Sequence, residues 1–131
     1  MVKIKKMNTI CAISTPYGSG GIAVIRVSGE SAIPIVDSLF HGRKSLLEAA
    51  AYTVHYGEIR REIKGDRLEV KGEDEILDQV LVSVFRAPHS FTGEDVVEIA
   101  CHGSLYIQQT LLQWLVDAGC QLAKAGEFTQ R

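Results

Sequence analysis

The sequence has no excess of positive charge, few cysteines and no long apolar run. Its 14 Lys and Arg against 16 Asp and Glu give a net charge of −2, so it lacks the basic surface that binds phosphate backbones, and we predict that this domain alone does not bind nucleic acid. Three well-separated cysteines indicate a reduced, cytoplasmic protein rather than a disulfide framework. The apolar stretch behind Lys3 ends by Ser14 and no run reaches the roughly 20 residues of a membrane helix, so we expect neither an export signal nor a membrane span.

The length and apolar content predict a single domain over residues 1–131. The chain has 131 residues, of which 46% are hydrophobic, which is long enough for one domain with a core and too short for two. Apolar periodicity predicts an α+β fold, with a mixed sheet of about five or six strands and two main helices packed on it. The expected strands lie at 7–14, 21–28, 52–63, 80–85, 96–101 and 120–123, and the expected helices at 30–40 and 105–118.

Two of the expected strands each carry one lone charge in an apolar run. Strand 96–101 carries Glu98, and strand 21–28 carries Arg26. Because side chains alternate along a strand, Glu98 shares a face with His102 and not with its apolar neighbours. A carboxylate within a sheet needs a cation or N–H donors. Two interpretations stay equally open from the residues alone: Arg26 and Glu98 pair with each other, or both point into one pocket that a polar ligand completes.

The patterns of two other stretches indicate a structural role rather than ligand binding or catalysis. The loop T-P-Y-G-S-G-G at 15–21 has no Lys to reach a phosphate and leads into a strand, so close backbone packing is its expected role. Residues 60–75 are heavily charged and predict a solvated excursion with a hairpin at Gly65-Asp66. The final G-E-F-T-Q-R has no stop signal, and we expect the chain to be a fragment of a longer protein.

Four separated blocks of the sequence are typical of one protein family. They read T-P-Y-G-S-G-G-I-A-V-I-R-V-S-G, D-Q-V-L-V, R-A-P-H-S-F-T-G-E-D-V-V-E and A-G-E-F-T-Q-R. In content and order these blocks resemble the N-terminal domain of the MnmE (TrmE) family of bacterial tRNA-modification GTPases, over nearly the whole chain. One departure is His102-Gly103-Ser104, where the family usually has H-G-G.

The resemblance implies a folate-binding domain related to the glycine-cleavage T-protein, with 5-formyltetrahydrofolate or a related reduced folate as a one-carbon source. Arg26 and Glu98 match the family's ligand residues, which favours the shared pocket, with His102 and the loop 18–21 near its rim. No catalytic or metal-binding residue is assigned. Because the T-protein relatives contain two copies of such a unit in one chain, the resemblance also implies a homodimer. The apolar strands support this, since two helices do not supply enough cover for both faces of their sheet.

For the whole protein, the resemblance implies modification of carbon 5 of the tRNA wobble uridine together with an FAD-containing partner similar to MnmG (GidA). GTP, Mg and K are expected only for a GTPase domain beyond residue 131. A terminal catalytic cysteine and a further folate-contacting lysine are also expected beyond that residue. This chain is therefore expected to bind a ligand and to dimerise without being catalytic by itself.

Three other functions compete with this interpretation. A folate-dependent one-carbon transferase needs an acid or base beside the folate, for which Asp95 and His102 are the candidates. A metal-binding module would use Cys101 and His102, but adjacent strand residues point to opposite faces. A purely structural dimerisation domain is compatible with the same strands and helices.

Overall fold

The structure, a computed structural model, describes residues 8–16, 18–62, 74–88, 90 and 92–130. Strands and helices alternate irregularly along these ranges. The elements are β1 (Ile10–Ile13), β2 (Ile22–Ser28), α1 (Ala32–Asp37), β3 (Phe40–Gly42), the 3-10 helix η1 (Leu46–Glu48), β4 (Thr53–Glu62), β5 (Asp74–Phe85), β6 (Val96–His102), α2 (Leu105–Asp117), β7 (Gln121–Leu122) and α3 (Glu127–Gln130).

All seven strands form one mixed sheet in the order β3-β4-β5-β6-β2-β1-β7. Only β1 and β7 run parallel, and every other neighbouring pair is antiparallel. The α+β prediction is therefore confirmed. The strand missing from the prediction is β3, which forms at the end of the segment expected to be a helix.

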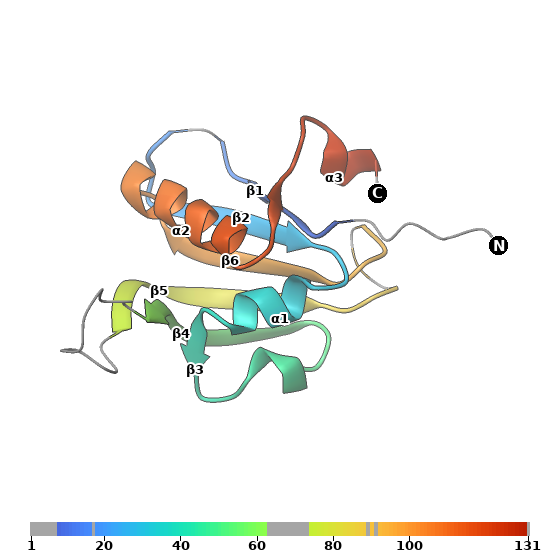
Figure 1. The fold of residues 1–131 in the computed structure, drawn as a ribbon, viewed down its shortest axis with the longest axis horizontal. Coiled ribbons are helices and arrows are strands. Elements are labelled where there is room, and N and C mark those ends of the chain that lie inside the picture. Colours follow the sequence, from blue (N-terminus) through green and yellow to red (C-terminus); the bar gives the residue numbers. More distant parts are fainter. Residues whose placement is uncertain (1–7, 17, 63–73, 89, 91, 131) are drawn as a thin grey trace.

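Helices α1 and α2 both pack on one face of the sheet (Figure 1). Alternate residues of the central strands point into the core between the sheet and the helices, where Ile25 of β2, Ile99 of β6 and Leu115 of α2 are completely buried. The remaining side chains of these strands point to the opposite face, which is called the open face below. No helix in the described ranges is long and apolar enough to span a membrane.

Helix α1 is shorter than the predicted helix at 30–40. It ends at Asp37, and Phe40 instead begins β3, pairing with Ile59 of β4. The ring of Phe40 lies against Gly42 and Gly57, where an added Cβ would come within 2.6 Å of ring atoms. Helical periodicity is therefore overridden by a tertiary contact that only two glycines allow.

Helix α2 agrees with its prediction to within one residue. Its N-cap is Ser104, whose side chain accepts a hydrogen bond from the Ile107 N–H at 3.1 Å. Such a cap contributes on the order of 1 kcal/mol to helix stability. Ser104, which stands where the resemblance leads one to expect glycine, thus supplies a capping side chain. The helix ends before Gly119, whose φ of +124° suits a glycine.

The glycine loop packs closely against the turn between β6 and α2, as its composition predicts. The Gly20 N–H donates to the Gly103 carbonyl at 3.1 Å, and the Gly103 N–H donates to the Gly21 carbonyl at 3.2 Å. The buried Gln108 side chain donates to the carbonyls of Gly18 and Gly103, at 3.1 and 2.9 Å. The loop and the start of α2 therefore form one packed unit.

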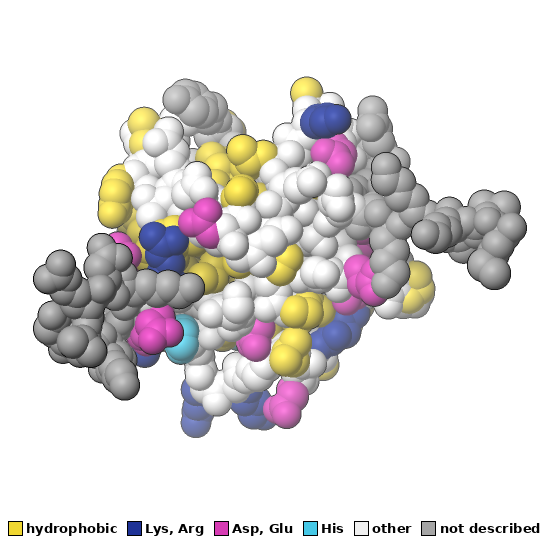
Figure 2. Space-filling view, viewed as in Figure 1, with side chains coloured by type: hydrophobic (Ala, Val, Ile, Leu, Met, Phe, Trp, Pro, Cys, Tyr) yellow, Lys and Arg dark blue, Asp and Glu magenta, His cyan; other side chains and the backbone are white. Residues whose placement is uncertain are grey.

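The charged segment between β4 and β5 is only partly described, and the hairpin expected at Gly65-Asp66 lies outside the described residues. Its ends extend the sheet, because Arg61 pairs with Glu75 and Glu62 with Asp74. On the face that carries the helices, side chains of both charges are interspersed (Figure 2). This agrees with the near balance of charge in the sequence.

We predict that Gly103→Ala lowers the free energy of unfolding by about 1–3 kcal/mol, the range typical of overpacking. An added Cβ there would lie 2.7 Å from the Gly20 carbonyl carbon, and this contact involves backbone that cannot easily move. Urea denaturation measures the effect. The control is Gly21→Ala, where a Cβ meets nothing within 4 Å. Equal stability of the two variants would contradict the packing described here.

Candidate functional site

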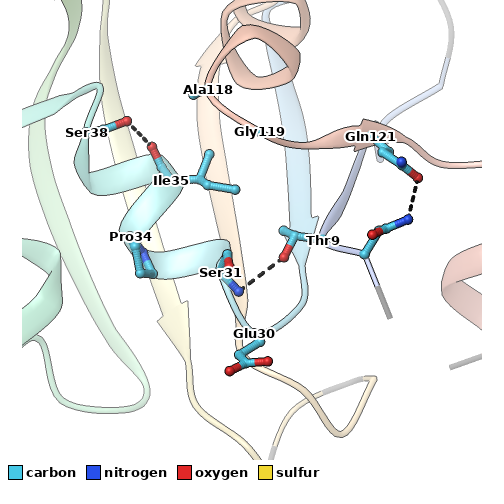
Figure 3. Close-up of a pocket in the computed structure, with 10 residues that line it drawn as sticks. Thr9, Glu30, Ser31, Pro34, Ile35, Ser38, Ala118, Gly119 and Gln121 are labelled. Carbon is cyan, nitrogen blue, oxygen red and sulfur yellow. Dashed lines mark hydrogen bonds between the residues drawn. The ribbon is translucent and has the colours of Figure 1, made fainter. Parts of the chain in front are cut away.

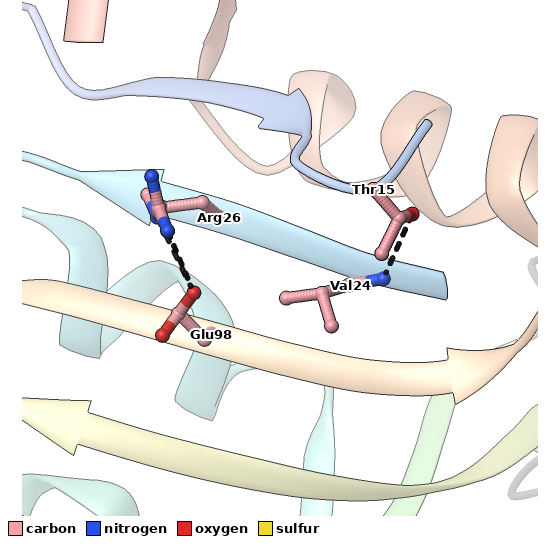
Figure 4. A network of polar contacts seen from close by, with 4 residues as sticks. All are labelled: Thr15, Val24, Arg26 and Glu98. Carbon is pink, nitrogen blue, oxygen red and sulfur yellow. Dashed lines mark hydrogen bonds and ion pairs between the residues drawn. The ribbon is translucent and has the colours of Figure 1, made fainter. Parts of the chain in front are cut away.

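The register between β2 and β6 places Arg26 directly opposite Glu98. The Arg26 Nη2 and Nε atoms lie 3.0 and 3.3 Å from Glu98 Oε2, and the two side chains point toward each other from neighbouring strands of the open face (Figure 4). Of the two interpretations left open by the sequence, the structure contains the direct pair.

The Arg26–Glu98 pair remains accessible to a ligand. The two side chains are 25% and 26% exposed. Both arginine contacts use Oε2, and within the described residues Oε1 of Glu98 accepts no hydrogen bond. The cross-strand neighbours are small, with Ala12 opposite Arg26 and Ser83 opposite Glu98. The pair therefore has short side chains opposite it, and Oε1 of Glu98 can accept a hydrogen bond from a new donor.

An aromatic residue that the sequence analysis missed lies beside Arg26. Phe128 belongs to α3, and its ring centre is 5.9 Å from the Arg26 guanidinium carbon. The short strand β7 leads the chain to this position by pairing with β1 (Figure 1). The signal that was available is the block A-G-E-F-T-Q-R, which contains this phenylalanine.

His102 shares a face with Glu98, as alternation predicts, but it lies at the far end of β6. The two residues are four positions apart along the strand, which corresponds to about 13 Å. The cavity of about 180 Å³ near His102 is lined by Ile22, Tyr56 and Ala100 among others, and by neither Arg26 nor Glu98. His102 therefore lies further along the strand from the pair, and its place at the rim of a common site, like that of the loop 18–21, stays a prediction.

Asp78 binds His102 through both of its carboxylate oxygens. Oδ1 lies 2.7 Å from His102 Nδ1, and Oδ2 accepts the His102 backbone N–H at 2.7 Å. The Asp78 side chain is only 9% exposed, whereas that of His102 is 69% exposed. The buried carboxylate thus holds an exposed imidazole in one orientation.

Cys101 points away from His102 into the core, as expected for adjacent strand residues. Burial, assisted by the negative charge of Asp78, raises the pKa of the Cys101 thiol to about 11. The thiol is therefore protonated at neutral pH and is a poor metal ligand. Within the described ranges, no three His, Cys, Asp or Glu side chains are grouped to hold a metal ion.

Asp95, the other candidate acid or base, has a structural partner. Its Oδ1 accepts the Ala87 N–H at 2.8 Å, and its carbonyl accepts the Gly29 N–H at 2.9 Å. These bonds tie the loop after β5 to the end of β2. Asp95 therefore acts in this structure as a loop anchor.

The helix side of the sheet carries a hollow of about 560 Å³ between α1 and β7 (Figure 3). Polar atoms around it are already paired: the Ser31 N–H donates to Thr9 Oγ1 at 3.1 Å, and Asn8 donates to Gln121 at 3.0 Å. None of the residues predicted to bind a ligand lines this hollow. The open face, with Arg26 and Glu98, remains the candidate site.

We predict that the Arg26–Glu98 pair contributes little to folding. A double-mutant cycle with Arg26→Ala and Glu98→Ala should give a coupling below about 1 kcal/mol, because partly exposed ion pairs are weak. The comparison variant Ile25→Ala removes a fully buried side chain from the same strand and should cost about 2–5 kcal/mol. Chemical denaturation measures both. A coupling above about 2 kcal/mol would contradict this prediction and show that the pair stabilises the fold.

Comparison with known proteins identifies relatives over almost the entire chain. A family model described as GTP-binding protein TrmE N-terminus matches residues 9–131. A protein of Parabacteroides distasonis named tRNA modification GTPase MnmE is 55% identical over 128 residues, which cover 95% of this chain and 26% of that protein. Proteins of the same name from Listeria welshimeri and Flavobacterium johnsoniae are each 46% identical over 126 residues, covering 96% and 95% of this chain and 25% of each relative.

The chain thus spans about a quarter of the length of these curated relatives. The resemblance inferred from the four sequence blocks is confirmed by the family model, which covers all of the described strands and helices. The chain belongs to the family of TrmE N-terminal domains.

Proposed function

We propose that this domain binds a reduced folate, such as 5-formyltetrahydrofolate, at the Arg26–Glu98 pair. The observation that carries the proposal is a partly exposed ion pair on the open face, with Oε1 of Glu98 free of hydrogen bonds among the described residues. Family membership supports it, because both residues match the family's ligand positions. The domain would act as the N-terminal part of a tRNA-modifying GTPase.

The chemistry of the pair suits the two kinds of polar group on a folate. A carboxylate accepts two N–H bonds from the aminopyrimidine edge of a pterin, and the arginine fork donates to a carbonyl, formyl or carboxylate oxygen. The pair must loosen when the ligand binds, but a partly exposed ion pair is worth only about 0–1 kcal/mol. Hydrogen bonds to charged groups contribute about 1.5–3 kcal/mol each, so exchange for ligand contacts is favourable.

The side chains directly opposite the pair on the neighbouring strands are short. Ala12 and Ser83 flank it across the strands, and Phe128 borders it on the side of α3. An aromatic ring there would cover one face of a bound pterin, as aromatic side chains commonly do with planar ligands. We therefore assign Phe128 to the proposed site together with Arg26 and Glu98.

Binding is favoured over one-carbon transfer by the positions of the two candidate acids or bases. Asp95 is held by the Ala87 N–H, and His102 lies about 13 Å along the strand from Glu98. Asp95 is thus engaged by a backbone N–H, and His102 is beyond hydrogen-bond reach of a group held at Glu98, whereas general acid–base catalysis requires such reach. The domain would therefore hold and orient the one-carbon carrier for a reaction completed elsewhere.

We predict that Glu98→Ala weakens binding of 5-formyltetrahydrofolate by roughly 1–3 kcal/mol, the usual result of removing one partner of a polar contact. Calorimetric titration measures the affinity. The matched control is Glu58→Ala, since Glu58 is also 26% exposed and pairs with Arg60 at 2.8 Å. If Glu98→Ala binds as tightly as the control while remaining folded, Glu98 does not belong to the site.

A wider proposal concerns the complete protein to which this domain would belong. We infer that the complete protein is a cytoplasmic GTPase that uses GTP, Mg and K in a separate domain. With an FAD-containing partner similar to MnmG (GidA), it would modify carbon 5 of the wobble uridine in tRNA. The reduced folate bound by this domain, whose fold we propose to be related to the glycine-cleavage T-protein, would supply the one-carbon unit for that reaction.

We further propose that the domain forms a homodimer through the open face. Large apolar side chains gather there on β4 and β5: Val54 and Tyr56 are each 61% exposed, and Leu81 is 49% exposed. Both helices pack on the other side of the sheet, so these residues are not covered by them. Burial of such a patch is worth about 25 cal/mol per Å². A second copy related by a two-fold axis would present the same patch in return.

We predict that Tyr56→Lys converts the chain at about 10 μM from dimer to monomer in sedimentation analysis, a concentration that detects ordinary weak dimers. A charge at the centre of an apolar interface loses its hydration and opposes association. Tyr106→Lys is the control, because Tyr106 is an equally exposed tyrosine, at 69%, on α2. A monomeric unmodified chain, or equal effects of both substitutions, would remove the open face as the dimer interface.

A further inference from the structure

The contacts between Asp78 and His102 fix the orientation of the His102 imidazole ring. A β-bulge in β5 precedes Asp78: Ile59 pairs with Asp78 while Arg60 pairs with Ile76, so that Leu77 is the extra residue. Bulges change the direction of a side chain and are frequent next to functional sites. Here the bulge brings a 9% exposed carboxylate under a 69% exposed histidine. Burying a carboxylate costs free energy unless a partner with good hydrogen-bond geometry offsets the loss of hydration, and His102 is that partner here.

The arrangement leaves the other ring nitrogen facing solvent. Asp78 accepts from Nδ1, so Nε2 is the atom presented at the open face. With Nδ1 held by Asp78, a hydrogen on Nε2 would be available to an anionic group that approaches from the open face. His102 therefore has the geometry of a binding residue with a fixed direction of approach.

The surface between the two polar pairs is apolar. Starting from Arg26 and Glu98, the next side chains on the open face are Val24 and Ala100, which lie opposite each other on β2 and β6. The last pair on these strands is Ile22 and His102. The cavity of about 180 Å³ beside His102 is lined by Ile22, Ala100, Leu81 and Tyr56. A polar end, an apolar middle and a second polar end thus follow one another over about 13 Å.

We propose that His102, held by Asp78, binds a carboxylate of the benzoylglutamate tail of the folate. This inference rests on the proposed function, because it requires the pterin edge to lie at Arg26 and Glu98. The aromatic ring of the tail then lies over Ala100 and beside Ile22. Its glutamate reaches Nε2 of His102, so the site distinguishes complete folates from free pterins.

The substitution that tests this inference is His102→Asn. The asparagine amide can still donate to Asp78 in place of Nδ1–H, so the buried carboxylate keeps a partner, while Nε2 is removed. The matched control is His41→Asn, which changes an exposed histidine on β3 at the edge of the sheet. Circular dichroism and thermal melting establish that both variants remain folded.

Calorimetry should compare two ligands on the 131-residue chain, 5-formyltetrahydrofolate and a 5-formyltetrahydropterin that lacks the benzoylglutamate. We expect His102→Asn to weaken the complete folate roughly three- to tenfold, the range typical of one lost polar contact, and to leave the pterin within about twofold. The control should change neither. Equal loss for both ligands, or loss for neither, would overturn the role of His102.

The same titrations separate this inference from the proposed function. If the unmodified chain binds neither ligand, the folate site itself fails and the tail contact fails with it. If it binds both ligands and His102→Asn behaves like the control, only the tail contact fails. Nuclear magnetic resonance of the His102 ring in the unmodified chain gives an independent measurement. Its signals should shift on addition of the complete folate and not on addition of the pterin, and the reverse result would contradict the inference.

Discussion

The antiparallel register between β2 and β6 is the constraint on which the site depends. Side chains alternate with a period of two, so a slip of one residue would exchange the faces of a strand. Such a slip in β2 would expose Ile25 and turn Arg26 into the core, at a cost of several kcal/mol for the unpaired charge. The fully buried side chains of Ile25, Val27 and Ile99 therefore set the register. The same register brings Arg26 to Glu98.

The two faces of the sheet differ in burial and in role because both main helices pack on the same face. The covered face holds most of the buried apolar residues, so it supplies most of the hydrophobic stabilisation. The open face can then carry the Arg26–Glu98 pair at little cost, since both side chains remain partly hydrated. The Arg26–Glu98 and Asp78–His102 pairs lie at opposite ends of that face. Recognition can thus be altered there without disturbing the core.

Much of the fold could be predicted from local sequence. Alternating and 3.6-residue apolar patterns identified six of the strands and both helices, because those periods follow directly from backbone geometry. The prediction failed at Phe40, which continues a helical pattern but belongs to β3. Its ring fits only because Gly42 and Gly57 leave space for it. Both glycines lie outside the predicted helix at 30–40, so the pattern of that segment gives no indication of the contact.

For the candidate site, the sequence by itself determined which residues carry charge on apolar strands and which family the motifs resemble. Those properties depend on neighbouring positions in the chain. Only the tertiary structure decided the partners: Glu98 is 72 residues from Arg26, and Asp78 is 24 residues from His102. Phe128 is likewise distant from Arg26 in the sequence, and it lies beside Arg26 because β7, which precedes α3, pairs with β1. Such contacts are set by strand order and by the core that holds the strands together, and no local period encodes them.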